Sequence, residues 1–258
     1  MNYVIFTSGG NDSIALTQWA YEQGLSDVTV AYSNTGWAAD YWAERMERVQ
    51  QWAESLGFRY VEIASEGMES LVERKKAWPR GGGGKFQFCT EALKEGPARE
   101  WLDKADPDKS ATCMVGIRRE EGEGRRASSR LNWPEWVEES ERHGGRQLWS
   151  PLVRHRQKDR DSLLDSTPFE PLPYRSKECY PCVNANKGEL KHLDENTVQK
   201  VEVIELDAGT NSKGNPRVLF SPTRHNGAVG IRAVVEDAKK GGDDLFGSTI
   251  CDAGWCGD

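Results

Sequence analysis

The sequence has no apolar run approaching the ~18 residues that a membrane span requires. Its mean hydropathy is -0.72, and no basic segment followed by an apolar one opens the chain. We therefore expect neither membrane insertion nor secretion through a cleaved signal, and we expect a cytoplasmic location. Basic residues are in deficit, since 34 Lys and Arg stand against 41 Asp and Glu, a formal net charge of -7. This balance argues against a dedicated nonspecific DNA-binding protein, but not against a local basic cleft.

Histidine and cysteine are also scarce, with four and six residues among the 258 of the chain. The four histidines show no spacing typical of metal ligands. Six cysteines would allow three disulfides, but a cytosolic chain of this length buries enough surface without them. Metal binding or catalysis is therefore the favoured role of the cysteines.

The first sixty residues alternate between strand and helix patterns. Apolar runs with β-branched and aromatic residues at 3–6, 28–32 and 58–63 predict buried strands. Apolar residues at helical spacing follow the first run, and the same spacing recurs from 38 to 56. Short links between such elements imply a parallel sheet with right-handed crossovers.

The rest of the chain is less regular. The glycine run at 81–84 is a candidate hinge or lid. We divide the chain into a nucleotide-binding α/β domain, residues 1–175, and a C-terminal extension, residues 176–258. Apolar spacing predicts a fourth strand at 111–115 and helices at 90–102, within 190–206 and at 231–239.

A glycine-rich hexamer, Ser8-Gly9-Gly10-Asn11-Asp12-Ser13, joins the first strand to the first helix. Glycines let the backbone approach an anion closely, and the N–H groups at a helix start form an anion-binding nest. Ser8 and Ser13 would add hydroxyl donors. Asp12 would repel phosphate unless it orders the loop or holds a Mg²⁺ that bridges the phosphates. The alternative is an ordinary strand–helix turn, which has a similar composition.

In this position the hexamer resembles the SGGxDS signature of the PP-loop ATP pyrophosphatase superfamily. The resemblance implies that ATP is cleaved between its α and β phosphates. Pyrophosphate would sit in the loop, and AMP would be transferred to a carbonyl or similar oxygen of a substrate.

Further segments resemble the PAPS reductase branch of that superfamily, in the order of the family and over about residues 3 to 190. The segments are Ser33-Asn34-Thr35-Gly36, Cys89 to Pro97, Gly116 to Glu121 with Arg125, and Trp149 to Leu152. Gly122 stands where this family usually has Ser. The implied fold class is α/β, a five-stranded parallel sheet with helices on both faces, followed by an irregular C-terminal extension that contains cysteines.

The same resemblance implies roles for individual residues. Asn34, Thr35 and Gly36 would line the adenosine, next to the loop of residues 8–13. Gly116 would belong to the nucleotide-binding set with Arg118 and Arg125, and Lys94, Arg118 and Arg125 would face phosphate or a second substrate.

The stretch 116–160 is basic within an acidic chain, because ten Arg and one Lys stand against eight acids. Alone, such a stretch is usually a solvated surface. Here it follows the carboxyl end of a predicted parallel strand, where open α/β sheets bind ligands, so a role facing phosphate gains weight.

Cys179 and Cys182 form a C-x-x-C pair, which alone fits a redox, zinc or iron–sulfur site. A zinc site needs four ligands, which Cys251 and Cys256 would complete. In the cluster-bearing sulfonucleotide reductases, a cysteine at the position of Cys89 joins such a pair about ninety residues later. The matching separation here implies a [4Fe–4S] cluster on Cys89, Cys179 and Cys182.

The fourth cluster ligand is left open by this resemblance. The reductases have two adjacent cysteines at the first site, whereas Phe88 precedes Cys89 here. Either Cys251 or Cys256 completes the set, or one iron stays open, as in the cluster-dependent tRNA thiolation enzymes that also carry the PP-loop. Cys113 lies in an apolar strand and is expected to be a buried core residue.

Three functions follow from these patterns. We favour an ATP-dependent sulfur transferase: ATP with Mg²⁺ adenylates a substrate oxygen, and sulfur from a cluster or persulfide displaces AMP. The acceptor would be a tRNA, a DNA or a small molecule. The alternative is a PAPS or APS reductase, in which Cys256 is the nucleophile and a thioredoxin-like reductant resolves the product. The third is a non-catalytic, zinc-stabilised nucleotide-binding partner.

The candidate catalytic residues are Asp12, Lys94, Arg118 and Cys256. An intact loop with Asp12 favours ATP cleavage, because the assimilatory reductases usually have a degenerate loop. Cys256 shares only the Cys-Gly dipeptide with the C-terminal motif of the reductases.

Overall fold

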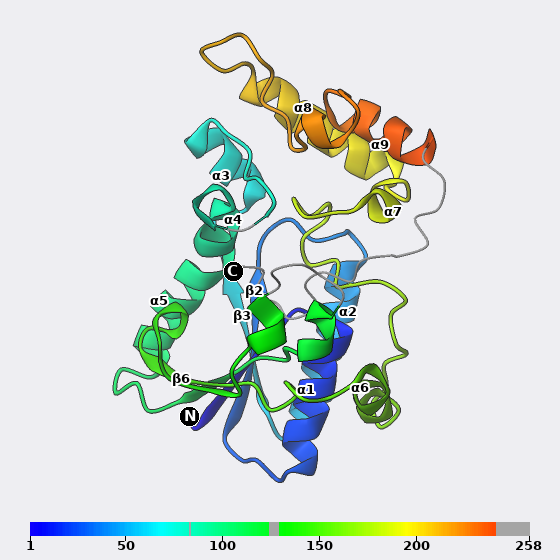
Figure 1. Ribbon diagram of the computed structural model, residues 1–258. Coiled ribbons are helices and arrows are strands. Elements are labelled where there is room, and N and C mark those ends of the chain that lie inside the picture. Colours follow the sequence, from blue (N-terminus) through cyan, green and yellow to red (C-terminus); the bar gives the residue numbers. More distant parts are fainter. Residues whose placement is uncertain (83, 124–128, 241–258) are drawn as a thin grey trace.

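A computed structural model of the protein describes residues 1–82, 84–123 and 129–240 (Figure 1). Three predicted site residues, Arg125, Cys251 and Cys256, lie outside the described residues. The strands are β1 (Tyr3–Thr7), β2 (Val28–Asn34), β3 (Arg59–Ala64), β4 (Thr112–Met114), β5 (Trp136–Ser140) and β6 (Arg146–Trp149). The α-helices are α1 (Asn11–Glu22), α2 (Trp42–Ser55), α3 (Met68–Lys75), α4 (Phe88–Thr90), α5 (Gly96–Ala105), α6 (Gln157–Leu164), α7 (Lys187–Leu190), α8 (Glu195–Ala208) and α9 (Ile231–Lys240).

The strands form one sheet in the order β3-β2-β1-β4-β6-β5. All neighbouring pairs from β3 to β6 are parallel, and β5 runs antiparallel to β6 at the edge. The predicted α/β fold with a five-stranded parallel sheet is therefore confirmed. The structure adds a sixth strand to it.

The sixth strand, β5, has no clear signal in the sequence. Its burial alternates poorly, and most of its side chains are exposed. It is held at the edge by the ring of Trp136, which stacks on Trp149 of β6 with centroids 4.8 Å apart and an interplanar angle of 11°. A register shift between Val137 and Ser140 interrupts the pairing. Packing rather than strand propensity therefore creates this element.

Helices cover both faces of the sheet, as predicted. Because successive side chains of a strand point to opposite faces, Ile5 of β1 packs with α1, α2 and α6, whereas Val4 and Phe6 pack with α5. Two hydrophobic cores result, one on each face. This sandwich fixes the strand ends that carry the glycine-rich loop.

A third core lies beyond the carboxyl ends of the strands, where Figure 1 shows α7, α8 and α9 near α3 and α4. Here α9 buries Ile231, Val234, Val235 and Ala238, which lie on one helix face. Helices α8 and α9 match the helices predicted within 190–206 and at 231–239. The core contains residues from both sides of the division proposed between 175 and 176, which remains a prediction.

No helix in the described ranges is long and apolar enough to cross a lipid bilayer.

One fully buried ion pair ties β6 to the end of α5. Arg146 is 0% exposed, and its Nε donates to Asp106 Oδ2 at 2.7 Å. Its other nitrogens donate to the carbonyl oxygens of Leu102 at 3.0 Å and of His143 at 3.1 Å. Burial alone would raise the pKa of Asp106, but the bonds from Arg146 and from the following turn hold it below the usual value. The guanidinium therefore balances a carboxylate that is almost wholly removed from solvent.

We expect Arg146→Leu to lower the free energy of unfolding by about 3–5 kcal/mol, because it leaves the Asp106 carboxylate buried without its partner. Arg154→Leu is the matched control, since its side chain is 77% exposed and pairs with Glu135 at 3.4 Å. This control should cost less than about 1 kcal/mol. Urea unfolding measures both, and equal losses would contradict the importance of the buried pair.

Candidate nucleotide and thiol site

The glycine-rich loop lies where the strand order reverses. The chain proceeds from β1 to β2 and β3 on one side, whereas β4 lies on the other side of β1. In open α/β sheets, ligands bind at the carboxyl ends of the strands at such a reversal. Residues 8–10 leave β1 at this point, and Gly116 follows β4 at the same edge. The two predicted phosphate-facing segments therefore meet at the central crevice.

Side-chain hydroxyls shape the loop from within. Thr7 Oγ1 accepts from the N–H of Gly9 at 3.1 Å, and Ser13 Oγ accepts from the N–H of Ser8 at 3.3 Å and donates to the carbonyl of Gly10 at 3.0 Å. Helix α1 begins after Gly10 without any side-chain cap. The N–H groups of its first turn have no intrahelical acceptors, so they remain for an anion.

Helix α2 holds the loop from outside. The indole Nε1 of Trp42 donates to the carbonyl of Ser8 at 3.1 Å, and Nε of Arg45 donates to the carbonyl of Gly9 at 2.7 Å. Both carbonyls are thereby engaged on the α2 side of the loop, which leaves the electropositive N–H groups to the crevice.

At two positions of the site, only glycine leaves room for the neighbouring atoms. Gly9 has φ +69°, and a Cβ there would lie 2.6 Å from Met46 Sδ. A Cβ on Gly116 would lie 2.6 Å from the carbonyl oxygen of Asp12, an obstacle on the backbone that cannot rotate away. Gly116 therefore allows the segment after β4 to touch the start of α1.

Asp12 and Arg118, both predicted catalytic residues, form a buried ion pair across 106 positions of sequence. Arg118 Nε donates to Asp12 Oδ1, while Asp12 Oδ2 has no hydrogen-bond partner among the described residues and lies 3.9 Å from Arg160 Nη1. Burial alone would lower the pKa of Arg118, but Asp12 outweighs burial and raises it. The pair balances the charge of the Asp12 carboxylate, whose Oδ2 also faces a second cation, Arg160.

Most arginines of the basic stretch 116–160 are already neutralised within the fold. All of those described except Arg119, which donates to the carbonyl of Trp133, pair with carboxylates. The pairs join Arg118 to Asp12 and Glu120, Arg130 to Glu121, Arg142 to Glu95, Arg146 to Asp106, Arg154 to Glu135, Arg156 to Glu123 and Arg160 to Asp161. The stretch is therefore less available to phosphate than its composition suggests.

The predicted adenosine turn borders a cavity beside the loop. Asn34 and Gly36 line a space of about 400 Å³ together with Met46, the residue that faces Gly9. The Asn34 amide donates to Glu62 at 2.7 Å and accepts from the N–H of Gly36 at 2.9 Å, which fixes the turn. Thr35 faces the other way, into the cysteine site.

Cys89, Cys179 and Cys182 line one small cavity of about 20 Å³ with Thr35 and Lys94. Burial raises the pKa of Cys89 to about 11, whereas the hydrogen bond with Cys179 lowers the pKa of Cys182 to about 5. The hydrogen bond from Cys179 therefore favours the thiolate form of Cys182 over those of its two neighbours. Cys113 is 0% exposed in β4, away from this cavity, as expected.

Lys94 lies at the thiols rather than at the glycine-rich loop. It is 7% exposed, lines the thiol cavity, and its Nζ pairs with Glu178. Burial alone would lower the pKa of Lys94, but Glu178 and the thiols raise it. A second buried cation, Arg175, interacts electrostatically with Cys182. Two cations therefore lie near the thiols, and each is paired with a carboxylate: Lys94 with Glu178 and Arg175 with Glu189.

In donor chemistry this trio of thiols fits an iron–sulfur cluster or zinc, both of which bind thiolate. The described residues contain no group of three or more His, Cys, Asp or Glu side chains spaced to hold a metal ion. Their cavity has room for about one water molecule. Seating a cluster therefore requires the three thiols to spread.

The thiol loop is bonded directly to the adenosine turn. Thr35 Oγ1 donates to the carbonyl of Glu178 at 2.8 Å, and the N–H of Tyr180 donates to the carbonyl of Trp37 at 2.7 Å. Trp37 Nε1 in turn donates to the carbonyl of Pro181 at 3.0 Å. Movement of either segment must therefore disturb the other.

The glycine-rich loop is hydrogen-bonded to the segment that leads to the thiol loop. The Asn11 side chain donates to the carbonyl of Leu172 and accepts from its N–H, both at 2.9 Å. Residues 172–182 thus run from the phosphate loop to the thiols.

The sequence model of the phosphoadenosine phosphosulfate reductase domain matches residues 2–179. The chain belongs to this family. The match covers the glycine-rich loop, the turn at 34–36, Cys89 and Cys179. The resemblance stated from these motifs is therefore confirmed.

Two solved structures are similar to this chain at low identity. A phosphoadenylyl-sulfate (PAPS) reductase from Candida auris, in a phosphate complex, has 14% identity and a TM-score of 0.41, over 66% of this chain and 75% of that chain. The U34-tRNA thiolase NcsA from Methanococcus maripaludis, with its [4Fe-4S] cluster, has 12% identity and a TM-score of 0.44, over 93% and 72%. No curated protein sequence matches this chain.

In this member of the phosphoadenosine phosphosulfate reductase family, three charged residues of the site were not predicted from the sequence. Glu178 is the partner of Lys94, Arg160 approaches Asp12, and Arg175 interacts with Cys182. The position of Glu178 directly before Cys179 was the one available signal.

We expect Gly116→Ala to weaken ATP binding by at least about tenfold, because the added Cβ must displace the backbone of Asp12 at the start of α1. Gly24→Ala is the control: it has φ +68° and nothing within 4 Å of the new Cβ. The control should lose stability through its backbone conformation but keep ATP affinity. Calorimetric titration with ATP measures both variants, and unchanged affinity of Gly116→Ala would contradict this placement of the nucleotide.

Proposed function

We propose that this family member is an ATP-dependent sulfur transferase that cleaves ATP to AMP and pyrophosphate and replaces an acceptor oxygen by sulfur. One observation carries the proposal: the turn beside the phosphate loop is hydrogen-bonded to the loop that bears the thiols, through Thr35 and Glu178. An adenylated acceptor and a sulfur-bearing thiol site would thus lie in one continuous crevice.

ATP would bind with its β and γ phosphates against the N–H groups at the start of α1. The adenosine would occupy the cavity bordered by Asn34 and Gly36, whose volume of about 400 Å³ lies in the range of small-molecule sites. Asp12 Oδ2, which lacks a hydrogen-bond partner in the described part of the chain, would contact Mg²⁺ at the phosphates. Arg118 would hold Asp12 in place.

The reaction has two steps. An acceptor oxygen attacks the α phosphorus of ATP and pyrophosphate leaves, which gives the acceptor a good leaving group. A sulfide supplied at the thiol loop then attacks the acceptor carbon, and AMP leaves with the original oxygen. No net oxidation occurs, so this sequence needs a sulfide donor but no reductant.

The thiols Cys89, Cys179 and Cys182 would hold a [4Fe–4S] cluster, which supplies an iron that can bind sulfide. Lys94 and Arg175 would offset the negative charge that thiolates and sulfide bring into a buried space. Thr35 orients the loop through the carbonyl of Glu178. In this proposal one iron keeps no cysteine ligand and is open to sulfide; Cys251 or Cys256 as a fourth ligand is the alternative.

Family membership favours one alternative, reduction of PAPS or APS to sulfite. There the nucleotide is the substrate, its sulfur is attacked by Cys256, and a thioredoxin-like reductant resolves the thiosulfonate. The intact glycine-rich loop with Asp12 supports ATP cleavage over this alternative. The two reactions differ in their products, pyrophosphate from ATP or sulfite from PAPS.

Asp12→Asn should lower pyrophosphate release from ATP and Mg²⁺ by about 100-fold or more, because the amide cannot replace the carboxylate at the metal. Asp165→Asn is the matched control, since Asp165 is exposed after α6, and it should keep the wild-type rate. A coupled pyrophosphate assay with candidate acceptors measures both. Wild-type activity of Asp12→Asn would contradict the proposed role of Asp12 in binding Mg²⁺.

Anaerobically purified protein should contain iron and acid-labile sulfide in equal amounts, and Cys89→Ala and Cys182→Ala should each lose most of both. Cys113→Ala is the control, since that thiol is buried in β4, and it should keep the wild-type content. Metal and sulfide analysis tests this directly. One zinc per chain without sulfide would contradict the proposed cluster and favour the hypothesis of a zinc-stabilised nucleotide-binding partner.

A further inference from the structure

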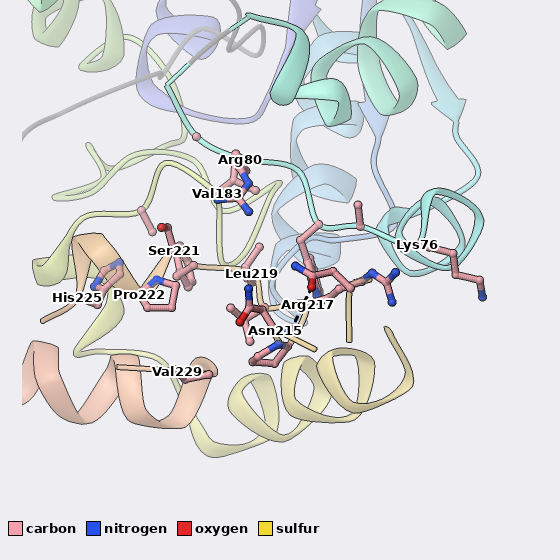
Figure 2. A pocket seen from close by; sticks show the side chains of 18 of the residues that line it. Lys76, Arg80, Val183, Asn215, Arg217, Leu219, Ser221, Pro222, His225 and Val229 are labelled. Atoms are coloured by element: carbon pink, nitrogen blue, oxygen red, sulfur yellow. Dashed lines mark hydrogen bonds between the residues drawn. The ribbon is translucent and has the colours of Figure 1, made fainter. Parts of the chain in front are cut away.

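A larger cavity, of about 780 Å³, lies between the segment after α3 and the loops that join α8 to α9. Figure 2 shows Lys76 and Arg80 from the first segment and Arg217 from the second among the side chains that line it. Its volume is that of a site for a ligand of nucleotide size. Neither the glycine-rich loop nor the adenosine turn contributes to it.

The described lining of this cavity includes no Asp or Glu, although the whole chain carries a net charge of -7. The side chains of Lys76 and Arg80 form no ion pair or hydrogen bond within the described residues. Arg217 donates Nη1 to the carbonyl of Ala208 at 2.8 Å and pairs with no carboxylate in the same ranges. These cations contrast with the arginines of 116–160, which the fold neutralises.

An acid behind the cavity wall, Glu205, is already engaged by backbone N–H groups. Glu205 accepts from the N–H of Leu219 at 2.9 Å through Oε1 and from the N–H of Ile231 at 2.9 Å through Oε2. Its carboxylate therefore fixes the shape of the loop between α8 and α9 and lies among backbone N–H groups. Positive charge is left unbalanced at the cavity.

A buried donor in the wall also lacks an acceptor. Trp78 is 5% exposed, lines the cavity, and its indole N–H has no hydrogen-bond partner in the described part of the protein. A buried donor without an acceptor costs about 1–3 kcal/mol. An anionic ligand in the cavity would balance the three cations, and Trp78 forms part of its wall.

The cavity is separated from the thiols by one residue. Val183, which follows Cys182, lines both this cavity and the thiol cavity. On the other side, the N–H of Gly82 donates to Asn184 Oδ1 at 2.9 Å, and a Cβ on Gly81 would lie 2.6 Å from the carbonyl of Val183. The segment that carries Arg80 is thus clamped to the loop that carries the cysteines.

We propose that this cavity binds the phosphate groups of the acceptor, a nucleotide that is either free or part of a single nucleic-acid strand. The assignment of the ligand as the acceptor rests on the proposed sulfur transfer, whereas the anion site rests on the cavity itself. Phosphates held by Arg80, Arg217 and Lys76 would place a base near the thiol wall.

The test compares two charge-reversal variants of the whole chain. Arg80→Glu/Arg217→Glu changes the cavity, and Lys104→Glu/Lys109→Glu makes the same change of charge in the last turn of α5 and in the turn before β4, on the amino-end side of the sheet. The probe is a fluorescein-labelled single-stranded RNA or DNA of about ten nucleotides, followed by fluorescence anisotropy. The cavity variant should bind at least about 100-fold more weakly, and the control within about threefold of wild type.

The salt dependence of the binding affinity is a second, independent test of phosphate contacts in the cavity. Loss of two phosphate contacts should reduce the slope of log affinity against log salt by about 1.4 in the cavity variant. Because Arg217 also bonds to the end of α8, Arg80→Glu alone serves as a variant that leaves the fold undisturbed, with an expected loss of about tenfold.

Competition by AMP separates the two sources of phosphate. If AMP displaces the strand and itself loses affinity in the cavity variant, the acceptor is a free nucleotide; if AMP does not compete, it is a strand. Absence of binding by both probes, equal weakening in both charge variants, or no weakening in the cavity variant overturns the inference. ATP affinity, measured in parallel, should not change in the cavity variant, and failure of the wild type to bind ATP would refute the proposed function instead.

Discussion

The buried ion pair between Asp12 and Arg118 is the constraint on which the site depends. A carboxylate with 0% exposure is very costly unless a partner balances it, and its partner comes from the far side of the strand-order reversal. The pair can form only because Gly116 allows the segment after β4 to contact the start of α1. Parallel topology, the absence of a Cβ and charge pairing thus act together to build one crevice at the glycine-rich loop, where we propose that phosphates bind.

A second constraint extends this crevice to the thiols. Residues 172–182 contact the glycine-rich loop through Leu172 and the turn at 34–36 through Glu178. Binding of a ligand in the cavity beside Asn34 and Gly36 would therefore change the positions of Cys179 and Cys182 through these hydrogen bonds. The third core, built by α7 to α9, supports this segment and frames the basic cavity behind Val183.

Much of the fold and part of the site could be predicted from the sequence, because local patterns encode them. Strand runs, helical spacing and the hexamer at residues 8–13 specify the parallel sheet and its loop. The edge strand β5 was not predictable, since stacking of Trp136 on Trp149 rather than alternation creates it. Ion pairs between residues far apart in the sequence could not be predicted either. Lys94 pairs with Glu178 and therefore lies at the thiols. The arginines of 116–160 pair with carboxylates, although composition alone suggests that they are free surface charges.

The central claim is that one crevice couples ATP cleavage to sulfur transfer, and product analysis tests it most directly. Protein purified anaerobically would be incubated with Mg²⁺, ATP, labelled sulfide and nucleic-acid acceptors, and in parallel with PAPS and a thioredoxin-type reductant. The account predicts pyrophosphate, AMP and labelled acceptor in equal amounts from the first reaction and no sulfite from the second. Sulfite from PAPS, with no pyrophosphate from ATP, would contradict it.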